Sequence, residues 1–203
     1  MVESDGLLTL TANGIPDHNA WVLENNSALT ESEVTVRFPT VPTLLENGQY
    51  TVSNDGAVGF ALNGVDIYSG YDMDTCCDFA IQKYDFTDYC TGYASSTFPS
   101  YGRYHYHFYP TSTAGYDGCL METCSMSEVS PVVGVAKDGF PIYGPVQLYS
   151  ASEGKIYINE NNCGDCVLTR MHTNILDDCN GIEVADGDVT KGNVYRYLLP
   201  GVA

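Results

Sequence analysis

Residues 58–70 read VGFALNGVDIYSG, and residues 133–145 read VGVAKDGFPIYGP. The two stretches agree at Val, Gly, Ala, Gly, Ile and Tyr with identical spacing, and Asn63 aligns with Asp138. Each carries an Asn-Gly or Asp-Gly pair between two apolar runs, which is the pattern of a strand, a tight turn and a second strand. The repeat therefore predicts two related β-hairpins.

An aromatic, alternating run ending in proline follows each hairpin: YHYHFYP at 104–110 and YRYLLP at 195–200. This order predicts a duplicated β unit, spanning 58–110 and 133–200, whose apolar faces pack into one core. Elsewhere, short alternating runs such as LLTLTANG and EVTVRFPTVP are separated by turn residues.

The chain as a whole is therefore predicted to be all-β. We expect an antiparallel β-sandwich or barrel-like domain over 13–203, preceded by a β-prone segment at 1–12. A short helix is expected only around 168–177.

Composition limits the partners. With 44% hydrophobic residues in 203, the chain can bury a sizeable core. Acidic residues outnumber basic ones 26 to 8, giving a formal charge of −18, which repels nucleic acid and anionic membrane surfaces. Cations, cell-surface polysaccharide and other protein surfaces are the expected partners. No apolar run reaches the length of a membrane span.

Eight cysteines indicate an oxidising, extracellular compartment and a disulfide-stapled domain. Adjacent Cys76 and Cys77 are expected to pair with different distant partners, because a bridge between neighbours is strained. The alternative for Cys163 and Cys166 is a zinc site, for which a second such pair is missing. The first residues lack the pattern of a signal peptide, whereas the sequon at Asn25 fits secretion. The full set is Cys76, Cys77, Cys90, Cys119, Cys124, Cys163, Cys166 and Cys179.

Five separated motifs occur in one order: TANGIPDHN, VGFALNGVDIY, RYHYH, SPVVGVAKDGFPIYGP and LDDCNG. In this order they resemble the YHYH-domain family from Thr11 to Pro200. The resemblance implies a secreted or surface-associated domain and does not imply a particular activity. One departure is plain: members commonly carry a second YHYH near the end, where this chain has YRYL at 195–198.

The histidines of the YHYH motif are the main candidates for a metal site. In a strand, His105 and His107 point to one side, and Tyr104 and Tyr106 point to the other. Copper and zinc bind three or four such ligands, and His18 in NGIPDH is the expected third ligand. The alternative is structural: buried histidines can hydrogen-bond the backbone and fix the register of the strand without any metal.

Carboxylates offer a second, weaker ion site. The loop DDCNGIEVADGD is rich in oxygen ligands for Ca²⁺, although it lacks EF-hand spacing. The alternative is that these side chains are simply solvated. The residues concerned are Asp177, Asp178, Asp186 and Asp188.

Two functions remain in view. The first is a non-catalytic extracellular module that forms homo-oligomers, filaments or a surface layer. In this hypothesis the strand LLTLTA of residues 7–12 adds to the sheet of a neighbouring copy. The apolar face of Leu8, Leu10 and Ala12 would be the inserted one. The alternative for this strand is that it pairs within its own domain. The second function is a secreted copper- or zinc-binding protein, or a metal-dependent enzyme, centred on His105 and His107. The sequence contains neither a GxSxG motif nor another recognised catalytic constellation.

Overall fold

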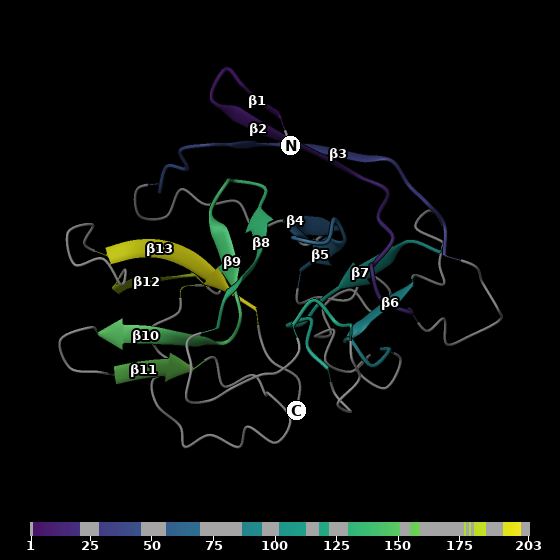
Figure 1. The fold of residues 1–203 in the computed structure, drawn as a ribbon. Coiled ribbons are helices and arrows are strands. Elements are labelled where there is room, and N and C mark those ends of the chain that lie inside the picture. Colours follow the sequence, from purple (N-terminus) through teal and green to yellow (C-terminus); the bar gives the residue numbers. More distant parts are fainter. Residues whose placement is uncertain are drawn as a thin grey trace.

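The computed structural model describes residues 2–20, 29–45, 56–69, 87–94, 102–112, 118–121, 130–150, 155–158, 177, 179, 181–185 and 193–199. Within these ranges the protein is all-β, as predicted, and none of the described sheets closes into a barrel. The residues at 168–176, where a helix was expected to begin, lie outside the described part. The described residues form thirteen strands, which are labelled in Figure 1. Their bounds are β1 Val2–Ser4, β2 Leu7–Ala12, β3 Val34–Pro39, β4 Ala57–Ala61, β5 Asp66–Tyr68, β6 Gly92–Ala94, β7 Tyr104–Tyr106, β8 Val132–Ala136, β9 Pro141–Tyr143, β10 Val146–Ser150, β11 Lys155–Ile158, β12 Gly181–Ala185 and β13 Asn193–Leu198.

The largest sheet has eight strands in the order β12-β13-β9-β8-β4-β5-β7-β6. Its two halves have the same construction. In the first, the β4–β5 hairpin pairs with β7 in parallel, and β7 pairs with β6 in antiparallel fashion. In the second half, the β8–β9 hairpin pairs with β13 in parallel, and β13 pairs with β12 in antiparallel fashion. The halves meet where β4 runs antiparallel to β8, so the sequence repeat becomes one continuous sheet.

The two hairpin turns have equivalent backbones. Gly64 and Gly139 have φ values of 83° and 91°, and each glycine N–H donates to the last alanine of the preceding strand at 2.9 Å. Only glycine takes such a φ without strain. The Asn-Gly and Asp-Gly signals thus predicted both turns correctly.

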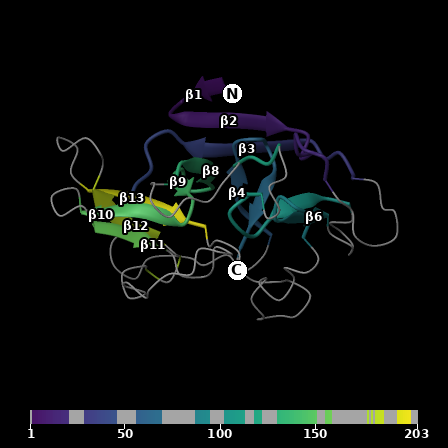
Figure 2. The same ribbon diagram turned by 60° about the horizontal axis from the view of Figure 1, so that its bottom comes forward.

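A separate sheet of β1, β2 and β3 lies across these turns (Figures 1 and 2). A β-carbon placed on Gly64 would lie 2.6 Å from Ala12 of β2, and one on Gly139 would lie 2.5 Å from the carbonyl oxygen of Pro39 in β3. The two ends of this sheet therefore rest on the two repeated hairpins.

Strand β2 is the centre of its own sheet, because β1 pairs with it on one side and β3 on the other. The β1–β2 turn is Asp5-Gly6, and both residues have positive φ, as a two-residue hairpin turn requires. The face of β2 predicted to enter a neighbour carries Leu8, Leu10 and Ala12. It lies on the same side as the buried Val34 and Phe38 of β3, toward its own chain.

The main core is formed by buried residues of the two hairpins, of β7 and of the segments that follow β7 and β13. Tyrosines make up much of it, and three of them expose at most 1% of their surface. Buried tyrosine hydroxyls need hydrogen-bond partners, so the core must also contain polar groups. Its members are Ala61, Val65, Ile67, Tyr104, Tyr106, Tyr109, Val133, Ala136, Ile142 and Leu199.

Candidate functional site

Strand β7 presents two different surfaces. Tyr104 and Tyr106 point into the core, with their ring centroids 5.5 Å apart. His105 and His107 project from the other side, with ring centroids 4.9 Å apart. All four side chains are buried. The strand therefore supports two separate polar clusters, one on each face.

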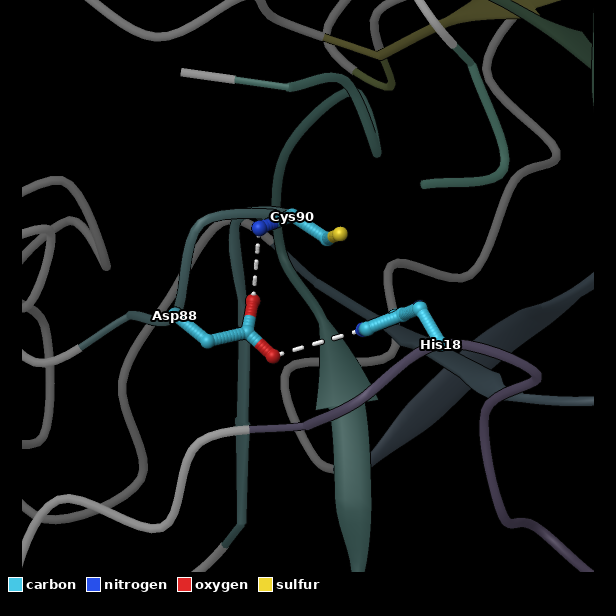
Figure 3. A group of neighbouring side chains, drawn as sticks. All are labelled: His18, Asp88 and Cys90. Atoms are coloured by element: carbon cyan, nitrogen blue, oxygen red, sulfur yellow. Dashed lines mark hydrogen bonds and ion pairs between the residues drawn. The ribbon is translucent and has the colours of Figure 1, made fainter. Parts of the chain in front are cut away.

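The first cluster is organised by Asp88. Its Oδ1 accepts hydrogen bonds from the backbone N–H groups of Cys90 at 2.8 Å and Gly92 at 3.2 Å. Its Oδ2 accepts from the Tyr104 hydroxyl at 2.5 Å and lies 3.3 Å from His18 Nε2. These contacts hold the carboxylate in one orientation, as Figure 3 shows for His18, Asp88 and Cys90.

His18 reaches this cluster from the segment that follows β2. Its Nε2 lies 3.0 Å from the Tyr104 hydroxyl oxygen. Because that hydroxyl donates to Asp88, its oxygen is the acceptor and His18 Nε2–H is the donor in this network. The His18 side chain is only 1% exposed, and its Nδ1 has no hydrogen-bond partner among the described residues. The imidazole is thus engaged at one nitrogen only.

Burial sets the protonation of the tyrosines. Desolvation is the largest cause that raises the pKa of Tyr104 above its usual value, and neighbouring Tyr106 and the Asp88 carboxylate act in the same direction. Desolvation also raises the pKa of Tyr106, whose hydroxyl lies 3.1 Å from Asn63 Nδ2. Both phenols therefore remain protonated at neutral pH.

The disulfide Cys90–Cys119 adjoins this cluster. A ligand nitrogen of His18, a carboxylate oxygen of Asp88 and Cys90 Sγ lie within 4.8 Å of one another. This is the only group of three such ligands among the residues that the structure describes. Because Cys90 Sγ is bonded to Cys119, it is not a thiolate and does not supply a metal ligand.

The second half of the large sheet repeats the network. Asp177 Oδ1 accepts from the N–H groups of Cys179 at 2.9 Å and Gly181 at 2.8 Å, and its Oδ2 accepts from the Tyr195 hydroxyl at 2.5 Å. The motif Asp-x-Cys-x-Gly, at 88–92 and 177–181, is the sequence signal of both loops. The second copy lies within the motif LDDCNG, but its repetition upstream of each aromatic strand was not recognised from the sequence.

The two networks differ in what covers the tyrosines. In the first half, the His18 ring lies 5.6 Å from Tyr104 and 6.4 Å from Tyr106. In the second, the Phe140 ring lies 4.9 Å from Tyr195 and 6.3 Å from Tyr197. A phenyl ring thus takes the place of an imidazole and brings no nitrogen.

The second cluster, on the other face of β7, contains both histidines of the motif. Tyr68 stacks on His105 with centroids 4.2 Å apart, and Tyr93 lies 4.4 Å from the same ring. His105 Nδ1 lies 3.2 Å from the Arg103 carbonyl oxygen, and His107 Nδ1 lies 2.5 Å from that of Ser69. The carbonyl oxygens can only accept, so each Nδ1 carries a proton.

The structure groups the predicted ligands differently from the sequence. His18 joins Tyr104 and Asp88, on the face of β7 opposite to His105 and His107, so the three imidazoles are not brought together. Asp177 is described, and its carboxylate is engaged by three donors. Outside the described residues lie Asn25, Cys76, Cys77, Cys124, Cys163, Cys166, Asp178, Asp186 and Asp188.

The fold and site together define a duplicated all-β domain whose halves each hold an Asp–Tyr network at the base of an aromatic strand. The model of the family described as YHYH protein matches residues 35–200, and the chain belongs to this family. A search of curated proteins and a search of solved structures each gave no match. The described residues contain no helix with the length and hydropathy that a bilayer crossing requires.

Proposed function

We propose that this protein is a non-catalytic extracellular module that assembles with further copies of itself through its N-terminal sheet. The observation that supports assembly is the outer edge of that sheet. Strand β1 pairs with β2 only from Leu7 to Thr9, so among the described strands only β3 pairs with Leu10–Ala12. Open main-chain groups at a sheet edge are the usual template for strand addition.

Exposed apolar side chains lie at one end of the same sheet. Leu7 is 36% exposed and Val41 is 79% exposed. Thr40, the residue before Val41, donates from both its backbone N–H and its hydroxyl to the Gly6 carbonyl at 3.0 Å. Val41 is therefore next in the chain to a residue that is bonded to the β1–β2 turn. Leu44 and Leu45 are also exposed. Burying this group between copies would add an apolar contribution to strand addition.

Burial of the polar network supports a non-catalytic role. The side chains of His18 and Asp88 are 1% and 2% exposed, and Tyr104 is 0% exposed. His18 Nε2, the Tyr104 hydroxyl and the Asp88 carboxylate are engaged with one another, and Asp88 also accepts from backbone N–H groups. The acidic charge of −18 opposes self-association, but physiological salt screens it beyond about 8 Å, and bound Ca²⁺ would lower it further.

Two lysine substitutions and one matched control test the proposal. Leu7→Lys and Val41→Lys add positive charge at one end of the sheet, whereas Glu183→Lys adds positive charge at an exposed position of β12. Among the described strands, β12 is an edge strand of the eight-stranded sheet and does not pair with the N-terminal sheet. We expect light scattering and electron microscopy to show assemblies for the wild type and the control, and smaller species for the two variants. A wild type that stays monomeric at high concentration, with and without Ca²⁺ and polysaccharide, would refute assembly.

A second candidate function is copper or zinc binding at His105 and His107. The observation that favours it is the pair of Nδ1–carbonyl hydrogen bonds, because metal-ligating histidines are commonly oriented in this way. The Tyr93 hydroxyl, 3.4 Å from His107 Nε2, would be the adjacent third donor.

Metal analysis of the native protein tests this candidate. We expect about one equivalent of copper or zinc, which is lost when both histidines are replaced by alanine. A purely structural role predicts a lower melting temperature in that variant and no metal in either protein.

A further inference from the structure

Three donor atoms of different chemistry lie unusually close together at the base of β7. Tyr104 Oη lies 2.5 Å from Asp88 Oδ2 and 3.0 Å from His18 Nε2, and the third side of this triangle, from Nε2 to Oδ2, measures 3.3 Å. Nitrogen and oxygen ligands bind metals at about 2.0–2.2 Å, so two ligands of one ion are about 3 Å apart. The triangle therefore already has the dimensions of one face of a coordination polyhedron.

The donor set favours a hard cation. Carboxylate and phenolate are hard oxygen donors, and imidazole is intermediate. The cysteine sulfur that the described residues bring to this group is bonded in the disulfide Cys90–Cys119. A phenolate and a carboxylate together bring two negative charges. This combination suits a trivalent ion better than copper(I) or zinc, which favour thiolate or several imidazoles.

We propose that His18, Asp88 and Tyr104 form a binding site for ferric iron, separate from the two histidines on the opposite face of β7. Iron enters as Fe³⁺ and undergoes no redox step. Tyr104 releases its hydroxyl proton to water and binds through Oη. His18 binds through Nε2 with its remaining proton on Nδ1, and Asp88 binds through Oδ2. Water fills the remaining positions on the ion.

Two features of the surroundings fit this assignment. The backbone N–H groups of Cys90 and Gly92 hold Asp88 Oδ1, which leaves Oδ2 directed at the ion. His18 Nδ1 has no partner among the described residues, so moving the ring proton to that nitrogen breaks no hydrogen bond. The charge of the ion would reverse the effect of burial, which otherwise keeps the phenol protonated.

The second half of the sheet provides an internal control. Asp177 and Tyr195 have the same carboxylate–phenol distance of 2.5 Å, but Phe140 stands where His18 stands in the first half. Among the described residues no imidazole joins this pair, so it should not hold iron. Tyr195→Phe is therefore the matched control for Tyr104→Phe.

The experiment measures iron in the full chain loaded with ferric citrate and freed of excess by gel filtration. We expect about one equivalent of iron, a visible phenolate-to-iron charge-transfer band, and tyrosinate modes in its resonance Raman spectrum. His18→Gln and Tyr104→Phe should remove the band and lower bound iron at least tenfold. Tyr195→Phe and the double alanine variant of His105 and His107 should keep both.

Several results would overturn the site. These are wild-type protein without iron or band, a band that survives Tyr104→Phe, and a band that Tyr195→Phe removes equally. Resonance Raman of the wild type does not depend on the folding of any variant, so iron bound without tyrosinate modes would also refute the assignment. Loss of iron in the double alanine variant alone would move the metal to the other face of β7.

Discussion

Replacing Tyr104 by phenylalanine should destabilise the protein far more than the same change at Tyr195. The Tyr104 hydroxyl is fully buried and is bonded to Asp88 at 2.5 Å and to His18 at 3.0 Å. Removing it takes away a hydrogen bond to a charged acceptor, worth about 1.5–3 kcal/mol, and leaves the His18 donor with only the longer contact to Asp88. We expect a total loss of about 3 kcal/mol.

The Tyr195 hydroxyl donates to Asp177 in the equivalent network, and Asp177 is exposed. Water can replace the lost hydroxyl there, so the expected loss is about 1 kcal/mol or less. For a domain of this length these losses correspond to roughly 6–12 °C and 4 °C or less in melting temperature. Thermal and urea unfolding of metal-free protein, followed by circular dichroism, measures both. Equal losses in the two variants would refute the claim that the first network is the more tightly enclosed one.

Three further outcomes are expected. Cys119→Ser, which opens the bridge to Cys90 across 29 residues, should cost about 3–4 kcal/mol in urea unfolding, and unchanged stability would contradict a formed bridge. Both Gly139 (φ 91°) and Gly56 (φ 68°) have positive φ, but only at Gly139 would an added β-carbon clash with its surroundings. Gly139→Ala should therefore lower the stability by about 1–3 kcal/mol more than Gly56→Ala. Burial raises the pKa of Asp66 above 3.8, despite its ion pair with the arginine before β7. The stability of the wild type, measured relative to Asp66→Asn, should therefore fall as the pH rises above about 4. A relative stability that rises over this range would show that the ion pair outweighs burial.

The sign of the Asp66 effect follows from proton binding. A carboxyl group whose pKa is higher in the folded state binds more protons there than in the unfolded chain, over the pH range between the two values. Raising the pH through that range therefore favours unfolding. The variant lacks this group and serves as the reference for all other titrating side chains.

Local rules in the sequence were sufficient for much of the fold. The Asn63-Gly64 and Asp138-Gly139 pairs predicted both hairpins, because a glycine with positive φ commonly closes a three-residue hairpin loop. Strand alternation gave the two faces of β7, because side chains alternate with a period of two. The Asp5-Gly6 pair carried the same turn signal for β1 and β2, and it was missed because only the strand after it was considered.

The candidate site could not be predicted in the same way, because it depends on which distant segments meet. His18 and Tyr104 are 86 residues apart in sequence, and two different faces of β7 were equally available to the imidazole. Period-two alternation says that His105 and His107 share a face, but it does not say which face the segment after β2 will cover. That choice is made by the N-terminal sheet, which rests with Ala12 against the turn at Gly64.

The placement of this segment also explains why the duplicated halves have diverged in sequence. In the first half, Asp17 precedes His18, and Asn63 Nδ2 lies 3.1 Å from both the Asp17 carboxylate and the Tyr106 hydroxyl. An aspartate at position 63 would place two carboxylates in contact, which costs free energy.

In the second half the equivalent residue is Asp138, and it accepts a hydrogen bond from the Tyr197 hydroxyl at 2.5 Å. Among the described residues no acidic side chain approaches it as Asp17 approaches Asn63, so a carboxylate is tolerated there. The same reasoning applies to the ring that covers the tyrosines. In the first half, His18 comes from a segment outside the repeat, and the β4–β5 hairpin carries the smaller Val65. In the second half, none of the described segments outside the repeat supplies such a ring, and the β8–β9 hairpin supplies Phe140 itself. Among the described residues, the segment after β2 that carries His18 contacts the tyrosines of the first half, and the asymmetry of the two halves matches this placement.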